Sequence, residues 1–260
     1  MRKIRIIAAT MGLTVMSLAG VAQEEDEGPI AFTYATYFNC DGGPLAAADK
    51  VIADDAERMN GLVEDGTISA WGWLAHHTGG QWSRIFYYQA ATMVALLDAS
   101  AAVQDAGDDD EEGDDADAAD DNDVFRTTCP RHDDYIWQVE NGSGGEKRGK
   151  VGFSVYHVCD IGREDRADEI VAEHVAPILD QFVEDGKLTS WGWSSHVVGG
   201  KYRKLQTMTA PDVKSLMKAR GDAIAAMYGE DGEDDEAGAE FTEICGPHVD
   251  YIWNIQLENT

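Results

Sequence analysis

Hydrophobic residues recur at helical spacing in one long segment of each half of the chain. The clear stripe spans residues 170–183, and a sparser one spans 51–63. This spacing predicts an amphipathic helix in each segment. Pro177 lies inside the second segment and predicts a kink there, because proline lacks the backbone N–H that a helix needs. The stripe residues are Ile170, Val171, Val175, Ile178, Leu179, Phe182 and Val183, and, in the first half, Val51, Ile52, Met59, Leu62 and Val63.

Strand-like segments surround these helices in the same order in both halves. Residues 32–40 and 151–159 are rich in aromatic and β-branched residues, which is typical of strands. A second strand follows each helix, and two glycines then predict a hairpin to a third strand. A second helix and a fourth strand complete each half. The third strands are expected at 82–89 and 202–209, the second helices at 91–104 and from Pro211, and the fourth strands at 124–139 and 241–257.

The two halves are copies of one unit. Trp71-Gly72-Trp73 recurs as Trp191-Gly192-Trp193, 120 residues later, and the glycine pair at 79–80 recurs at 199–200 with the same offset. A constant offset across a motif indicates an internal duplication. Gly66 and Gly186 end the preceding helices and are expected to adopt the left-handed C-cap conformation.

The expected division of the chain follows from this duplication. Residues 30–140 form the first repeat, 141–150 a linker and 151–259 the second repeat. Residues 1–22 have basic residues before a short apolar run, which predicts a secretory signal cleaved after Ala22. The mature protein is therefore expected to be periplasmic or secreted, with no membrane segment.

Acidic residues dominate the charge, which is −29 for the whole chain. Runs at 105–123 and 230–240 hold 12 acidic residues in 19 and 7 in 11. Such a surface excludes nucleic acid and anionic membranes as natural partners. Solvated loops are the simple interpretation of the runs, and loose cation binding is the alternative. The calcium-loop pattern fails because Ala119 stands where a glutamate is required, so no metal site is predicted.

Four cysteines, two in each half, indicate disulfides in an exported protein. Three connectivities are open, and the duplication favours one bridge in each half. The expected pairs are Cys40–Cys129 and Cys159–Cys245. These bridges leave no thiol to act as a nucleophile.

The element order βαββαβ, occurring twice, predicts an α+β fold built from two tandem ferredoxin-like units. In this topology the two cysteines of each unit lie at neighbouring strand ends. The chain resembles the dimeric α/β-barrel superfamily over residues 30–259. This resemblance implies two units packed sheet to sheet as an intramolecular α/β barrel, hence a monomer. Superfamily members include cofactor-free monooxygenases, isomerases, haem enzymes and ligand-binding domains.

Aromatic residues are the candidates for a ligand site. In the second strands the tryptophans share one face, and the small residues between them suit packing under helices. The tryptophans are therefore expected to face the space between the sheets, either as core filling or as the lining of a pocket. The candidate ligand-binding residues are Trp71, Trp73, Trp191, Trp193, Tyr135, Trp137, Tyr251 and Trp253.

Histidines are the candidates for chemistry. His76 and His196 occupy equivalent places and could serve as a base, a metal ligand or a haem ligand, or have only a structural role. His132 with Asp134, and His248 with Asp250, place an imidazole and a carboxylate on one strand face. Such a pair serves acid–base catalysis or a structural hydrogen bond at the disulfide end of the sheet.

Three functions are consistent with these features. The first is an exported protein that binds a small apolar or aromatic molecule between its sheets, without a cofactor. The second is a barrel-type enzyme, cofactor-free or haem-dependent, acting as an oxidoreductase or isomerase. The third is an acidic cation-binding or salt-adapted structural protein.

Overall fold

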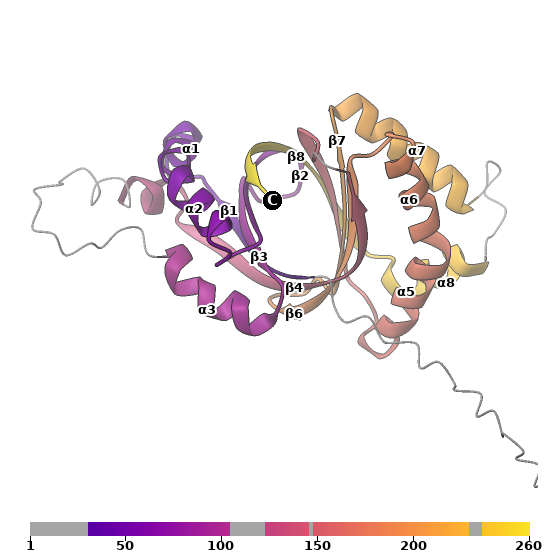
Figure 1. The fold of residues 1–260 in the computed structure, drawn as a ribbon. Coiled ribbons are helices and arrows are strands. Elements are labelled where there is room, and N and C mark those ends of the chain that lie inside the picture. Colours follow the sequence, from indigo (N-terminus) through magenta and orange to yellow (C-terminus); the bar gives the residue numbers. More distant parts are fainter. Residues whose placement is uncertain (1–30, 105–122, 146–147, 229–235) are drawn as a thin grey trace, which may run out of the picture.

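Eight antiparallel strands close into a barrel in the computed structural model, which describes residues 31–104, 123–145, 148–228 and 236–260 (Figure 1). Around the barrel the strands follow the order β1-β3-β2-β8-β5-β7-β6-β4. Inward and outward side chains alternate along each strand, so one set fills the barrel and the other meets the helices. The strands are β1 (Ala31–Asn39), β2 (Ala70–Gly79), β3 (Arg84–Ala90), β4 (Arg131–Gly144), β5 (Val151–His157), β6 (Ser190–Val198), β7 (Lys204–Ala210) and β8 (His248–Asn259).

The two halves join through strand pairing. β2 of the first half pairs with β8 of the second, and β4 pairs with β6. Both pairings contain register shifts, for example between His76 and Thr78. The expected shared interior is present, but the two sheets meet edge to edge around one barrel and do not stack as separate layers.

Helices cover the outside of the barrel on two opposite sides (Figure 1). Their bounds are α1 (Leu45–Asp54), α2 (Ala56–Glu64) and α3 (Met93–Gln104), then α5 (Glu164–Ile170), α6 (Ala176–Glu184), α7 (Val213–Tyr228) and α8 (Glu236–Cys245). A π-helical turn, Val171–Val175, separates α5 from α6, and Pro177 lies in the first turn of α6. At the place of the predicted kink, a π-helical turn ends just before Pro177 and α6 then begins with the proline in its first turn, where the missing N–H costs no helical hydrogen bond.

The glycines at the helix ends behave as expected. Gly66 has a φ of 79° and Gly186 a φ of 70°, both in the left-handed region. A backbone bond from Ile68 to Leu62 follows the first turn, and one from Leu188 to Phe182 follows the second. These turns send the chain straight from α2 into β2 and from α6 into β6.

Two expected boundaries are wrong. Residues 124–128 and 241–245 are helical, so the fourth strands begin only at Arg131 and His248. The linker expected at 141–150 is shorter, because Asn141 to Gly144 continue β4 and pair with β6. The segment 1–22, for which a signal is predicted, and most of the acidic runs lie outside the described residues.

Both expected disulfides are present, Cys40–Cys129 and Cys159–Cys245, and each stays within its own half. Each ties a residue shortly after a first strand to one shortly before a fourth strand. Among the described residues, none of the helices has the length and apolarity to cross a bilayer.

Candidate functional site

Aromatic side chains fill part of the barrel interior. Tyr251 and Trp253 of β8 stack with ring centroids 4.9 Å apart, and Tyr135 and Trp137 of β4 stack at 5.0 Å. Trp82 lies between these pairs and stacks on Tyr251 at 5.3 Å. The other aromatic members of this cluster are Tyr37, Tyr87, Tyr156 and Tyr202. Four of the eight predicted ligand-binding residues thus lie inside the barrel, as expected.

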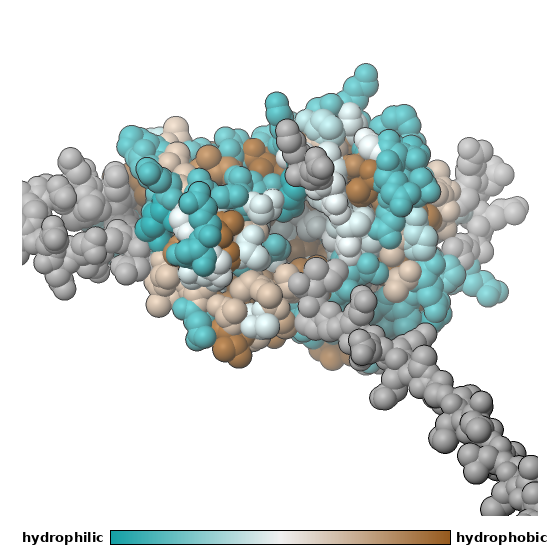
Figure 2. Space-filling model, viewed as in Figure 1, coloured by the Kyte–Doolittle hydropathy of each residue, from teal (hydrophilic) through white to brown (hydrophobic). Residues whose placement is uncertain are grey.

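A cavity of about 350 Å³ occupies the rest of the interior. Its floor is part of the aromatic cluster, through Tyr37, Trp137 and Tyr156. One wall is apolar, with Leu74, Ile85 and Leu205 among its residues. Small hydroxyl side chains also line the cavity from β5, β6 and β7, the strand that carries Leu205: Ser154, Ser190, Ser194, Thr207 and Thr209. Figure 2 shows the molecule hollowed between the two helical sides in this view.

A polar group lies at the mouth of the cavity. Arg148 makes an ion pair with Glu258 at 2.8 Å, and its guanidinium donates to the Tyr87 hydroxyl at 3.1 Å. Tyr87 in turn donates to Glu258. Burial works to lower the pKa of Arg148, but Tyr87 and Glu258 outweigh it and leave the pKa raised. Arg148 therefore stays charged, and its buried Nε has no partner within the described residues.

The four tryptophans of the second strands face the helices, so the expectation that they point into the barrel is wrong. The indole N–H of Trp71 donates to Asn60 of α2, and that of Trp191 donates to Asp180 of α6. Trp73 and Trp193 belong to the same helix-side clusters, although Trp191 also borders the cavity. Gly72 explains the reversal, since a Cβ there would lie 2.5 Å from the Tyr87 ring inside the barrel.

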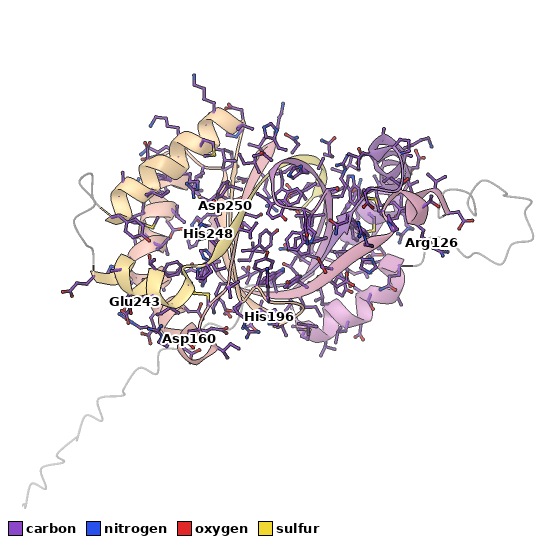
Figure 3. The ribbon with its side chains drawn as sticks, turned by 180° about the vertical axis from the view of Figure 1, so that it is seen from behind. Arg126, Asp160, His196, Glu243, His248 and Asp250 are labelled. Atoms are coloured by element: carbon purple, nitrogen blue, oxygen red, sulfur yellow. A yellow bond between two sulfur atoms is a disulfide. The ribbon has the colours of Figure 1, made fainter. Side chains whose placement is uncertain are left out.

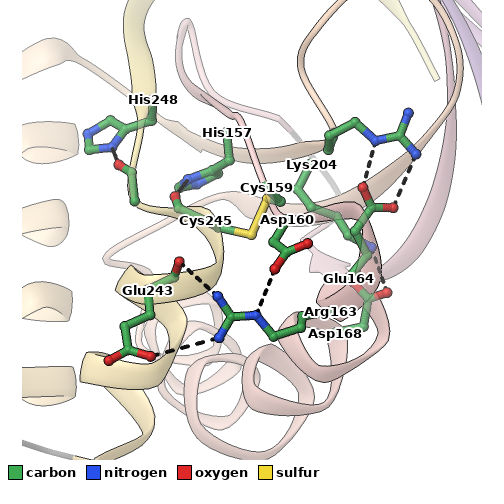
Figure 4. The surroundings of a disulfide bond; sticks show 12 residues. His157, Cys159, Asp160, Arg163, Glu164, Asp168, Lys204, Glu243, Cys245 and His248 are labelled. Carbon is green, nitrogen blue, oxygen red and sulfur yellow. Dashed lines mark hydrogen bonds and ion pairs between the residues drawn. A yellow bond between two sulfur atoms is a disulfide. The ribbon is translucent and has the colours of Figure 1, made fainter.

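Sequence reasoning missed two equivalent buried networks under these helices. Asp49 accepts bonds from Arg84 at 2.6 and 2.7 Å and from Trp73 at 2.8 Å. In the second half, Asp168 accepts from Lys204 and Trp193, both within 2.7 Å (Figure 4). Asp49 lies 24 residues before Trp73, and Asp168 lies 25 residues before Trp193. The nearly equal spacing of aspartate and tryptophan in the two halves was the sign of these networks in the sequence.

His76 and His196 lie beside the aromatic cluster and do not border the cavity. His76 meets the rings of Tyr251 and Trp253, with centroids 6.2 and 6.0 Å away. His196 meets Tyr135 and Trp137 at 6.0 and 6.1 Å. Burial is the main cause that lowers the pKa of both, so both rings are neutral at pH 7. The Nε2 atom of each is buried and has no partner within the described residues.

The His–Asp pairs form on the outer face of the barrel. His132 and Asp134 are 3.3 Å apart, and His248 and Asp250 are 3.7 Å apart. Asp250 also accepts from Arg220 of α7, which places the second pair on the helix side of β8 (Figure 3). Neither pair reaches the barrel cavity, and the structure does not bring them together with His76 or His196.

Comparisons with known proteins find similarity in fold only. No protein-family model and no curated protein matches the chain. A proposed monooxygenase from Fusobacterium nucleatum superposes with a TM-score of 0.62 at 7% identity, covering 89% of this chain and 95% of that chain. One from Lactobacillus acidophilus gives 0.58 at 8% identity, covering 89% and 96%. A novel haem-binding protein from Thermus thermophilus gives 0.50 at 12%, covering 88% and 91%.

These similarities support the barrel fold alone. Their low identities carry no activity over to this chain.

Proposed function

We propose that this is an exported binding protein that holds a small, largely apolar or aromatic molecule inside its barrel. The observation that carries the proposal is the cavity of about 350 Å³ with apolar residues, small hydroxyl side chains and a charged mouth. Small-molecule sites are mostly apolar with a few placed polar groups, and this cavity has that composition. The N-terminal segment and the two disulfides support export.

The lining indicates which polar atoms the ligand carries. Ser154, Ser194 and Thr207 can donate to or accept from a hydroxyl or carbonyl group. Arg148 Nε offers one further donor at the mouth. An aromatic molecule with one or two oxygen atoms can bond to the hydroxyl side chains and to Arg148 Nε, while its ring contacts Leu74, Ile85 and the aromatic floor.

A cavity-filling variant tests this site. Gly152 lies in β5 and borders the cavity, and a Cβ there would meet only Met208 O at 3.8 Å. Gly152→Leu is therefore expected to fold and to fill the cavity. The probe is N-phenyl-1-naphthylamine, whose fluorescence rises on transfer to an apolar site. We expect saturable binding to the unaltered protein and at least a tenfold loss in Gly152→Leu.

Gly61→Leu is the matched control. Gly61 is exposed on α2 with nothing within 4 Å, so the same side chain is added far from the cavity. This variant should bind the probe as the unaltered protein does. Equal binding by the Gly152→Leu variant would refute the barrel as the ligand site.

An enzyme is the second candidate, because His76 has a neutral ring with an unpartnered Nε2 beside the interior aromatic rings. His196 differs, since its Nδ1 accepts from Arg203 at 2.7 Å and its Nε2 therefore carries the proton. A neutral imidazole can act as a general base. A histidine-ligated haem does not fit the barrel cavity, since no histidine lines it. Among the described residues no cluster of three or more metal-binding side chains occurs, and the acidic runs proposed for cation binding lie largely outside them.

A further inference from the structure

A second cavity, of about 250 Å³, lies between the sheet and the helices of the second half. It is separate from the barrel cavity, since its walls come from the outer faces of β5, β6 and β7 and from helices α5 to α8. Its lining is mainly apolar and aromatic, with Trp193, Met208 and Phe241 among the residues. Polar side chains interrupt this lining, among them His157, Gln206 and Arg220.

The first half shows which residues occupy the equivalent positions. In the first half, Phe38 pairs with Arg84 on one side and His132 on the other. In the second half, His157 pairs with Lys204 and His248 in the same way, so His157 is the equivalent of Phe38. Gln206 is likewise equivalent to Phe86, since they pair with Trp193 and Trp73.

The second half thus has imidazole and amide groups where the first half has two phenyl rings. A polar exchange at both positions, facing one cavity, is unexpected for a core that only needs to be filled.

His157 carries the chemical argument. Its ring keeps the neighbours that Phe38 has, with Trp193, Phe241 and His248 centroids at 5.9, 5.5 and 5.5 Å. Its Nδ1 lies 3.0 Å from the carbonyl oxygen of Cys245 (Figure 4). Because a carbonyl only accepts, Nδ1 carries the proton and Nε2 is an acceptor. Burial lowers the pKa of His157 to about 4, which keeps the ring in this neutral form.

The Nε2 atom of His157 has no partner within the described residues, and the residue is only 6% exposed. A buried acceptor without a donor is costly and is expected where a ligand supplies the donor.

We propose that this cavity binds a small phenol-type molecule, with its hydroxyl donating to His157 Nε2 and its ring against Trp193 and Phe241. The volume suits a single substituted ring, and the methionine and aromatic walls suit its faces. This inference is independent of the barrel site.

Titration calorimetry with p-cresol and 4-methylanisole tests the proposal. The two probes have nearly the same shape, but only p-cresol has a donor. A site built around a buried acceptor should bind p-cresol about tenfold more tightly. The ¹⁵N signal of His157 Nε2 should shift on adding p-cresol, which places the probe at this atom. Equal affinities for the two probes, or an unmoved signal, would overturn the assignment.

His157→Phe restores the residue of the first half and should fold, since Phe38 already occupies that environment. We expect it to lose the preference for p-cresol, with an unchanged or higher urea midpoint. Gly152→Leu, which fills the barrel cavity, should keep the preference. Loss of the preference for p-cresol in Gly152→Leu would assign p-cresol to the barrel and refute this site. Loss of the preference in His157→Phe alone supports the site, whatever the barrel binds.

Discussion

At the scale of single residues, Asp49 is the acceptor at the centre of the polar network under the first-half helices. Burial works to raise its pKa, but hydrogen bonds from Arg84 and Trp73 outweigh burial and hold the pKa below the ordinary 3.8. The side chain of Arg84 is only 7% exposed, and this carboxylate is its counter-charge. The pair therefore anchors α1 to β2 and β3 through ionised Asp49.

Asp49→Asn should destabilise the protein in a pH-dependent way. Because the folded pKa of Asp49 is depressed, its stabilisation is present above the unfolded value and is lost as pH falls through the folded value. We expect a loss of about 2 kcal/mol at pH 7, where Arg84 loses its counter-charge. The difference from the unaltered protein should shrink between pH 4 and pH 2 in urea unfolding. A difference that grows on acidification would contradict this assignment.

The orientation of the tryptophans shows how far residue patterns reach. The alternation in Trp71-Gly72-Trp73 correctly predicts that the two tryptophans share one face of the sheet. It does not say which face, because a strand turned over about its own axis has the same alternating pattern. A small residue such as Gly72 fits equally well under a helix on the outer face or against an aromatic ring in the barrel interior. The Tyr87 ring decides between them, and it comes from a different strand, so short-range pattern could not reveal it.

At the scale of elements, the turns after α2 and α6 depend on glycine alone. Gly66 and Gly186 have positive φ, and nothing lies within 4 Å of a Cβ at either position. Substitution there strains the backbone without any steric clash. The cost of a side chain is therefore the cost of the left-handed conformation itself.

Gly66→Ala and Gly186→Ala should each destabilise the protein by about 1 kcal/mol, measured as a lower urea midpoint with an unchanged slope. Gly61→Ala is the internal control, because Gly61 lies inside α2 with equally open space. There alanine should stabilise by about 0.5–1 kcal/mol. The same sign for all three variants would show that φ does not decide the effect.

The elements that sequence reasoning found and missed differ in length and periodicity. The stripe at 170–183 is long enough to identify a helix, and Pro177 identified its interruption. The sequence predicts a strand at 241–245, where the structure has a helix, because a few apolar residues such as Phe241 and Ile244 fit either period. The barrel cavity was missed in detail, since Ser154, Ser194 and Thr207 are common residues that become a wall only after closure.

At the scale of the whole molecule, each half covers the sheet edges of the other and contributes to a common interior. Strands β2 and β4 would be sheet edges in an isolated first half, and they are covered by β8 and β6. The aromatic cluster draws Tyr37, Trp82 and Tyr135 from one half and Tyr156, Tyr202 and Tyr251 from the other. The Tyr251 hydroxyl also accepts from the backbone N–H of Gln81 at 2.9 Å, across the junction. The barrel interior is therefore built by both halves, while each half also has a helix-side cluster of its own.

The shared interior predicts one unfolding transition for the whole protein. Arg84→Met and Lys204→Met break equivalent buried ion pairs, one in each half, and each should cost about 2–3 kcal/mol. If the halves unfold together, both variants shift the same single transition in urea, and tryptophan fluorescence and far-UV circular dichroism give coincident curves. Independent halves would instead give two transitions, with each variant moving only one of them. Lys204→Arg, which copies the residue of the first half, should keep most of the stability that Lys204→Met loses, because a guanidinium still reaches Asp168.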